Sequence, residues 1–393
     1  MNRRDKSIKQ ENTTVPIRIA YCIPSLSHSG GMERVLTIKA NYLAEELNYD
    51  VNIIVTDEKD TQPYFKLSDK IKIWQLDVNI DNLWQYPIWK RLWLYKTKSS
   101  IYKKKLTEVL FTLHPDITIS LLRREINFIN SIHDGSRKIG EIHFGHYRYR
   151  KVKFNFLPLF LNKILSKLWM YQLYSKLKKL DAFVVLTHED ANNWLGVKNI
   201  KVIPNPITIQ PMGISTCLAK RVIAVGRYTE QKGFDLLIHA WEIVNKKHND
   251  WTLDIFGGGN SSYYIEKIKV ARLENYINCH GATPNIVQEY LNSSIFVLSS
   301  RFEGLPLVLM EAMACGIPPV SFACPCGPRD IISNGKNGIL CDNGNINQLA
   351  NGICSLIENK TLRINMGKIA AHDVQKYSID NIMSLWNNLF KQL

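Results

Sequence analysis

The chain has 393 residues, of which 45% are hydrophobic and 22% are charged. This composition excludes a disordered chain. Because the chain is longer than a single hydrophobic core usually supports, we expect two domains. The formal net charge is +15, and most of it lies in residues 1–201, which hold 33 Lys and Arg against 20 Asp and Glu. Such an excess predicts a polyanionic partner, either an anionic membrane, phosphate groups or nucleic acid.

The chain shows none of the sequence signals of secretion or membrane spanning. Residues 1–14 are polar and charged, unlike a signal peptide, and no run of 18 apolar residues occurs. Eight cysteines show no spacing typical of a disulfide framework or a zinc site. We therefore expect free thiols and a protein that stays in the cytoplasm.

The first half of the sequence alternates between short apolar runs and helical patterns. A strand at 17–23, a loop with two glycines, a helix at 32–47 and a strand at 51–55 form a βαβ unit of a parallel sheet. Further strands of this half are predicted at 117–121, 138–143, 182–186 and 201–203.

The second half repeats this alternation after a linker rich in Pro, Gly and small polar residues, which begins at Pro204. Its predicted strands are 221–225, 252–256, 295–298 and 319–322, and its predicted helices are 234–245, 262–274, 305–315, 345–358, 362–376 and 379–393. The fold class is therefore α/β, with two doubly wound domains in series. Ligands of such sheets bind at the carboxyl ends of the strands and between the domains.

Two glutamates stand out in the segment that follows the strand at 295–298. Glu303 falls on the loop after this strand, and Glu311 falls about two turns into a helix that we expect to start near Leu305. The unpaired N–H groups at the start of that helix can receive a phosphate or sugar oxygen. Glu311 lies among apolar residues, and a buried carboxylate needs a partner, so we favour a functional role over an exposed surface position.

Cations and glycines occupy the corresponding loops of other strands. Arg227 and Lys232 both lie in the first strand-to-helix turn of the second half, where two cations suit a diphosphate. Gly30 and Gly31 follow the first strand and let the backbone approach a ligand closely. The run Gly257-Gly258-Gly259 lacks the spacing of a dinucleotide fingerprint and is a weak signal alone.

Together these segments resemble the retaining GT-B glycosyltransferases of family four, especially the branch that builds bacterial exopolysaccharide and lipopolysaccharide. The resemblance runs from about Ile17 to the C-terminus and is densest over 221–340. It implies two Rossmann-like domains that face a central cleft. The acceptor-binding domain is expected at 1–204 and the nucleotide-sugar-binding domain at 205–376, with the helix at about 377–393 packed back on the first domain.

The resemblance also implies roles for single residues. Glu303 is expected to contact the donor sugar, Glu311 the ribose, and Arg227 and Lys232 the diphosphate. The loop of Gly30 and Gly31 lies over the donor. The donor is also expected to face the backbone amides of Gly304, Leu305 and Leu307.

The family places a histidine near the anomeric carbon, at the end of a strand of the first domain. His143 is our choice, His146 is the alternative, and Glu141 can share the site. The anomeric configuration is expected to be retained by front-face attack, with the leaving phosphate accepting the acceptor's proton. No Asp-x-Asp metal site is apparent, so we expect metal-independent catalysis without a cofactor. The donor is expected to be a UDP-sugar, with glucose, galactose and their N-acetylamino forms left open.

Two stretches of the first half, 82–107 and 142–180, contain no acidic residue. They mix Lys and Arg with Trp, Tyr and Phe, and the second has apolar residues at helical spacing. Basic amphipathic helices bind anionic membranes, although part of the apolar stripe must pack on the sheet. We expect peripheral binding to the inner face of the cell membrane, where relatives use polyprenyl-diphosphate-linked acceptors.

A different class of function is a non-catalytic membrane- or nucleic-acid-binding protein on the same scaffold, which the basic first half suggests. No known nucleic-acid-binding motif appears, and a non-catalytic scaffold would be expected to lose some of the charged residues of the second half. We therefore expect no nucleic-acid partner. A nucleotide-linked oxidoreductase is disfavoured because the dinucleotide fingerprint is missing.

Overall fold

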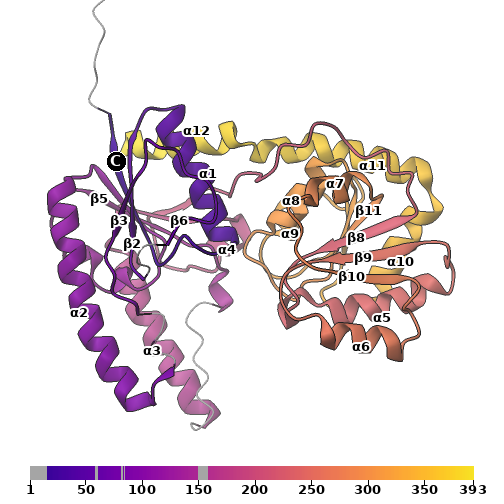
Figure 1. The fold of residues 1–393 in the computed structure, drawn as a ribbon, viewed down its shortest axis with the longest axis horizontal. Helices are drawn as coiled ribbons and strands as arrows, with labels where there is room; N and C mark the ends of the chain where they lie inside the picture. The colour runs from indigo at the N-terminus through magenta and orange to yellow at the C-terminus, as the bar shows by residue number, and fades with distance from the viewer. Residues whose placement is uncertain (1–15, 58–60, 81–82, 84, 149–157) are drawn as a thin grey trace, which may run out of the picture.

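The computed structural model describes residues 16–57, 61–80, 83, 85–148 and 158–393. They form two α/β domains, each built on a parallel sheet (Figure 1). The predicted fold class is confirmed. The central strands of both sheets are apolar and buried, as is typical of parallel sheets covered by helices on both faces.

The first sheet has the strand order β3-β2-β1-β4-β5-β6-β7, and all its pairings are parallel. Its strands are β1 (Arg18–Ile23), β2 (Asp50–Val55), β3 (Lys72–Gln75), β4 (Ile117–Ser120), β5 (Arg137–Glu141), β6 (Ala182–Val185) and β7 (Ile200–Val202). Its helices are α1 (Gly31–Glu45), α2 (Ile88–Leu113), α3 (Leu159–Leu177) and α4 (His188–Ala191).

The second sheet has the strand order β10-β9-β8-β11-β12-β13, again with parallel pairings. Its strands are β8 (Arg221–Val225), β9 (Thr252–Phe256), β10 (Ile277–His280), β11 (Ile295–Leu298), β12 (Pro319–Phe322) and β13 (Ile339–Cys341). The helices are α5 (Phe234–Asn245), α6 (Ser262–Val270), α7 (Ile286–Leu291), α8 (Leu307–Ala314), α9 (Pro328–Ile331), α10 (Ile346–Glu358), α11 (Lys360–Asp373) and α12 (Ile379–Gln392).

The last helix returns to the first domain (Figure 1). Asp380 of α12 accepts a hydrogen bond from the Tyr42 hydroxyl at 2.9 Å, and Asn387 accepts one from Tyr49 at 2.6 Å. Trp386, between them in sequence, is fully buried. The chain thus crosses between the domains twice, once between β7 and β8, where the predicted boundary at residue 204 lies, and once before α12.

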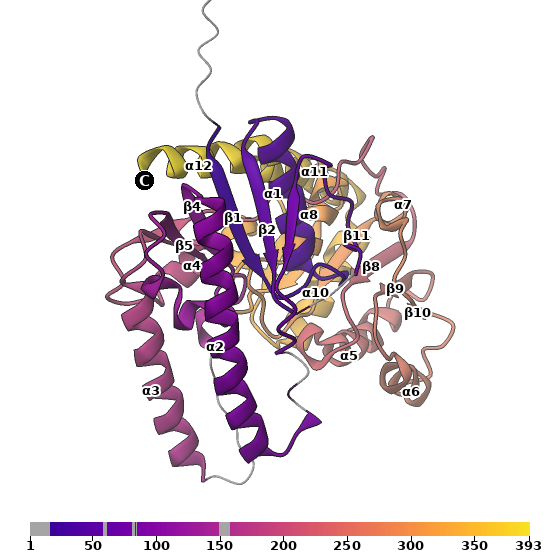
Figure 2. The same cartoon turned by 60° about the vertical axis from the view of Figure 1, so that its left-hand side comes forward.

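Helices α2 and α3 extend together away from the first sheet (Figures 1 and 2). Their C-terminal halves are anchored by buried side chains, Leu106 and Leu110 on α2 and Leu173 and Leu177 on α3. Their N-terminal halves project into solvent. Among the described residues, none of the helices combines the length and apolarity that crossing a bilayer requires.

Several predicted boundaries were wrong by a few residues. The predicted strand at 138–143 ends at Glu141, so His143 lies two residues beyond β5 rather than at its end. The predicted helix from Leu305 begins instead at Leu307, because Pro306 takes an extended conformation and precedes the first helical turn. Glu311 therefore lies about one turn into α8, not two.

Candidate functional site

Lys232 and Glu303 meet at the carboxyl end of the second sheet. Lys232 ends a short 3₁₀ turn after β8, and its Nζ donates a hydrogen bond to Glu303 Oε1 at 2.8 Å. Its aliphatic stem lies on Gly226, where a Cβ would approach Lys232 Cδ to 2.9 Å. Glu303 is buried on the loop after β11. The structure thus brings two predicted site residues into one ion pair.

The backbone around Lys232 is held in place from β11. Gly233 has φ of +62°, and a Cβ on it would lie 2.1 Å from the Ser299 carbonyl oxygen, so only glycine fits there. Arg301 donates two hydrogen bonds to the carboxylate of Asp235, at 2.9 and 2.7 Å. This guanidinium lowers the pKa of Asp235. The pair fixes the start of α5 against the loop that carries Glu303.

Arg227 lies in the same turn as Lys232, with its side chain exposed to solvent. The turn packs on the triple-glycine loop, since the Tyr228 N–H donates to the Gly258 carbonyl at 2.9 Å. A Cβ on Gly257 would lie 1.7 Å from the Gly226 carbonyl oxygen. The triple-glycine run, a weak signal in the sequence, therefore supports the turn that presents Arg227.

Glu311 is buried, with 3% of its surface exposed, and three residues from different parts of the chain bind it. Its Oε1 accepts hydrogen bonds from Arg34 Nη1 of α1 at 3.0 Å and from the Thr208 hydroxyl. Its Oε2 accepts one from the Tyr290 hydroxyl at 3.3 Å. Burial and the Glu311 carboxylate together raise the pKa of Tyr290. The carboxylate thus joins both domains and the segment between them.

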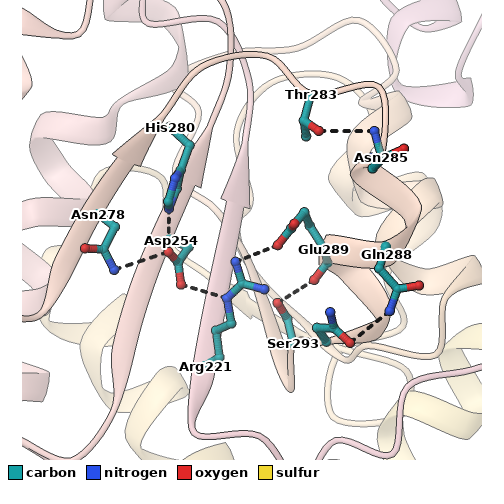
Figure 3. A network of polar contacts seen from close by, with 10 residues as sticks. Arg221, Asp254, Asn278, His280, Thr283, Asn285, Gln288, Glu289 and Ser293 are labelled. Atoms are coloured by element: carbon teal, nitrogen blue, oxygen red, sulfur yellow. Dashed lines mark hydrogen bonds and ion pairs between the residues drawn. The ribbon is translucent and has the colours of Figure 1, made fainter.

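A polar network holds α7 against the sheet (Figure 3), and Tyr290 belongs to this helix. Asp254 of β9 accepts hydrogen bonds from Arg221 at 2.7 Å and from His280 at 2.6 Å. Arg221 also pairs with Glu289, the residue before Tyr290, at 2.7 Å. Because Glu289 pairs with Arg221 of β8, the neighbouring Tyr290 is held where its hydroxyl can bind Glu311.

The two domains touch where the predicted site residues gather. A Cβ on Gly31 would lie 3.3 Å from Leu307 Cδ1, so the first turn of α1 faces the first turn of α8. A Cβ on Gly304 would lie 2.7 Å from the His143 carbonyl oxygen. The loop after β5 and the loop after β11 therefore run in direct contact, with Leu305 buried beside them.

His143 is buried close to an ion pair of the first domain. Its Nε2 lies 3.4 Å from Glu141 Oε1, and Glu141 in turn binds Lys39 Nζ through both oxygens at 2.6 Å. Burial lowers the pKa of His143 to about 4, because it outweighs the opposing effect of the Glu141 carboxylate. His143 is therefore uncharged at neutral pH.

His146, the alternative, is engaged elsewhere. Its Nε2 pairs with the Tyr174 hydroxyl at 3.0 Å, its ring packs edge-on against Trp194, and its backbone N–H donates to Asp190. These contacts join the loop after β5 to α3 and α4. His143 and His146 thus lie on one loop, which contacts Gly304 of the second domain through the His143 carbonyl oxygen.

The low pKa of His143 has a measurable consequence for stability. The unfolded chain binds this proton below about pH 6.5 and the folded chain only below about pH 4, so stability is lost as the pH falls between these values. When the pH falls from 7.5 to 5, we expect the free energy of unfolding of the parent to fall by about 2 kcal/mol more than that of His143→Asn. Denaturant titrations at both pH values measure it, with the exposed His239→Asn as control. An equal loss of unfolding free energy in the parent and in His143→Asn over this pH range would contradict the low pKa of His143 in the folded protein.

Several residues at this junction were not identified from the sequence. The burial of Glu311 predicted that it has a partner, but Arg34 lies 277 residues away in the chain. Thr208 sits in the predicted linker, and Tyr290 in a short helix that was not predicted. Arg34 lies one turn after the glycine pair, but it was not singled out in the sequence.

Comparisons with known proteins show the family to which the chain belongs. Residues 219–373 match the family model of glycosyl transferases group 1. An uncharacterized glycosyltransferase of Haemophilus influenzae is 30% identical over 95% of this chain and 99% of its own length. The amylovoran biosynthesis glycosyltransferase AmsD of Erwinia amylovora is 27% identical over 95% of this chain and 99% of its own length.

The fold has solved counterparts as well. The structure of Staphylococcus aureus TarM, a complex that contains UDP, matches with a TM-score of 0.73 and 21% identity, and it covers 95% of this chain and 99% of TarM. The two parallel, Rossmann-like sheets thus match the fold of GT-B glycosyltransferase structures. With the family match and the full-length relative, this shows that the chain is a member of the group 1 glycosyl transferases.

Proposed function

We propose that this glycosyltransferase is a retaining enzyme that moves a hexose or N-acetylhexosamine from a UDP-sugar to a lipid-linked or surface polysaccharide acceptor. The observation that carries the proposal is the Lys232–Glu303 ion pair, because Glu303 lies on the loop that meets the first domain. UDP as the donor nucleotide is supported by its presence in the TarM complex. A polysaccharide acceptor is supported by the Erwinia amylovora relative, which is named for amylovoran biosynthesis.

The donor diphosphate is assigned to the cations and free N–H groups of the second domain. Lys232 supplies a partly buried positive charge, and Arg227 supplies an exposed one on the same turn. The backbone amides of Gly304, Leu305 and Leu307, which have no hydrogen-bond partner within the described part of the chain, add donors of the kind that stabilise anions. When the bond to the sugar breaks, these groups stabilise the charge that develops on the diphosphate.

The sugar lies, in this proposal, between Glu303 and the loop of His143. Glu303 accepts hydrogen bonds from sugar hydroxyls, and Glu311 from the ribose. The uncharged imidazole of His143 places no cation beside the anomeric carbon, which becomes electron-deficient as the diphosphate leaves. The acceptor hydroxyl attacks from the same face, its proton passes to the leaving phosphate oxygen, and no protein nucleophile or metal takes part.

The stereochemistry of donor hydrolysis tests this proposal. We would incubate the full chain with α-configured UDP-sugars in water and record proton NMR spectra before the released sugar mutarotates. Retention predicts that the α-anomer appears first, in buffer with EDTA as well as without it. Early release of the β-anomer, or a rate abolished by EDTA, would contradict the proposed mechanism.

We also propose that the projecting ends of α2 and α3 bind the anionic surface of the membrane. Trp89, Leu92 and Trp93 on α2 and Phe160 and Leu168 on α3 are exposed, Trp89 by 72%. Neither projecting half carries an acidic residue, whereas Lys90, Arg91, Lys96, Lys163 and Lys167 lie among the aromatics. Lys98 and Lys105 instead bind backbone carbonyls and serve the fold. Trp84, Phe154 and Phe156, which also suggested membrane binding, lie outside the described residues.

Vesicle binding tests this surface. The triple variant Trp89→Ser, Trp93→Ser, Leu168→Ser is expected to bind vesicles with anionic lipid at least about tenfold more weakly than the parent, because the inserted apolar area is lost. Phe111→Ser is the matched control, since Phe111 is exposed near the anchored end of α2. Cosedimentation with phosphatidylglycerol-containing and neutral vesicles measures the effect. Equal binding of the parent to both vesicle types, or an unaffected triple variant, would contradict membrane docking.

A further inference from the structure

A buried ion pair in the first domain has a role beyond stability. Lys39, in the middle of α1, and Glu141, the last residue of β5, are each 1% exposed. Lys39 Nζ lies 2.6 Å from both carboxylate oxygens. Removing two charges from water costs several kcal/mol, and apolar residues of similar volume often stabilise a core as well as such a pair does. Its presence at this position therefore calls for a functional explanation.

Aromatic rings lie on the lysine side of this pair, and His143 lies on its carboxylate side. Trp386 of α12 places its ring 4.1 Å from Lys39 Nζ, and the Tyr21 ring of β1 lies at 5.8 Å. These rings cover the ammonium group, so its hydrogen bonds are directed to Glu141. On its other side, Glu141 Oε1 faces His143 Nε2 at 3.4 Å. The lysine, the carboxylate and the imidazole thus form a line from the core to the domain junction.

Two buried polar atoms beside this carboxylate have no hydrogen-bond partner among the described residues, the Tyr21 hydroxyl and His143 Nε2. A buried polar atom without a partner is rare and marks a strained or functional position. The charged groups that act on His143 are Glu141 and Lys39, with opposite effects on its protonation. Without Lys39, an unpaired carboxylate would remain next to the imidazole and favour its protonation.

We propose that Lys39 is a positioning residue for His143, acting through Glu141, with Trp386 of the C-terminal helix completing this support. The inference rests on the proposed function only in assigning His143 to the donor sugar. The ion pair fixes the Glu141 carboxylate against the imidazole and has no net charge. The imidazole, which packs 3.4 Å from this carboxylate without a hydrogen bond to it, therefore has no net charge beside it and stays uncharged at the point where the sugar becomes electron-deficient.

The test replaces Lys39 by Met, which has a similar length and no charge. The change removes a cation that disfavours protonation of His143 and leaves Glu141 unpaired beside it. We expect the pKa of His143 to rise by at least about one unit, kcat to fall at least about tenfold, and the KM for the UDP-sugar to stay within about twofold. NMR titration of histidine-labelled protein gives the pKa, with the His143 signal assigned from its absence in His143→Asn.

The matched control is Lys138→Met, because Lys138 is a buried lysine on the same strand, paired with Asp134 instead. It is expected to leave the titration of His143 and kcat unchanged. The proposal is overturned if Lys39→Met folds and its His143 titration matches the parent, since the pair would then serve stability alone.

A second variant covers the case in which Lys39→Met does not fold. Lys39→Met combined with Glu141→Gln removes both charges and leaves no uncompensated ion in the core. We expect it to fold, to keep His143 uncharged at neutral pH, to bind UDP like the parent and to lose about tenfold in kcat. Parental kcat in this variant would overturn the proposal. The titration of His143 does not depend on sugar transfer, so it decides the inference even if the proposed reaction fails.

Discussion

Replacing Lys232 by Met is expected to lower kcat/KM for sugar transfer by about 10²- to 10³-fold, which is the usual loss when one group that stabilises a developing anion is removed. Lys232 lies 2.8 Å from Glu303 and is the cation of this turn that is held in a partly buried position. A partly buried charge acts through a lower dielectric than a surface charge, so its loss is felt strongly. Steady-state kinetics with a UDP-sugar measure the effect.

The control for this change is Lys220→Met. Lys220 also pairs with an acidic residue of the second domain, Asp250, but both side chains are largely exposed. Such surface pairs contribute little, so kcat/KM and thermal stability are expected to match the parent. Transfer by Lys232→Met at the parental rate would contradict the assignment of the diphosphate to this turn.

Replacing Glu311 by Gln is expected to remove the protein's ability to recognise the ribose hydroxyls. The parent is expected to bind UDP about 10- to 100-fold more tightly than 2′,3′-dideoxy-UDP, because a hydrogen bond from the ribose to the charged Glu311 carboxylate is worth about 1.5–3 kcal/mol. Glu311→Gln should bind both nucleotides with similar affinity. Calorimetric titration of both proteins with both nucleotides gives the four affinities.

Arg34→Met separates ribose recognition from the contact between domains. It removes the guanidinium that binds Glu311 Oε1 but leaves the carboxylate in place. We expect weaker binding of both nucleotides, with the preference for UDP over the dideoxy form retained. If Glu311→Gln kept the parental preference, its carboxylate would serve only to join Arg34 and Thr208, and the ribose would have to bind elsewhere.

Much of the fold could be predicted from local patterns. The strands β8, β9, β11 and β12 occur at the predicted residues, because each is a short apolar run bounded by turn residues. The strand β3 was missed because it lies at the edge of its sheet and three of its four residues are exposed. In β10, only Ile277 is buried, so the sequence shows no continuous apolar run there.

The site could be predicted only in part, because several of its contacts join segments that are far apart in the sequence. Lys232 and Glu303 were assigned from their loops and from the family resemblance, and the structure places them in contact. The partners of Glu311 and the Lys39–Glu141 pair depend on how distant segments pack together. Nothing in the spacing of Arg34, Thr208 and Glu311 along the chain indicates that they converge. Contacts of this kind require the tertiary structure.

We infer that this glycosyltransferase binds a UDP-sugar with the loops of Lys232, Glu303 and Glu311. Nucleotide binding by the protein tests this inference most directly. Thermal unfolding would be recorded with UDP, GDP, ADP and their common sugars, for the parent and for Lys232→Met. A ligand at about 100 times its Kd adds about 2.7 kcal/mol of stability. We expect stabilisation by UDP and its sugars alone, and we expect Lys232→Met to lose it. Stabilisation by none of these nucleotides, or stabilisation by UDP that Lys232→Met retains in full, would contradict this inference.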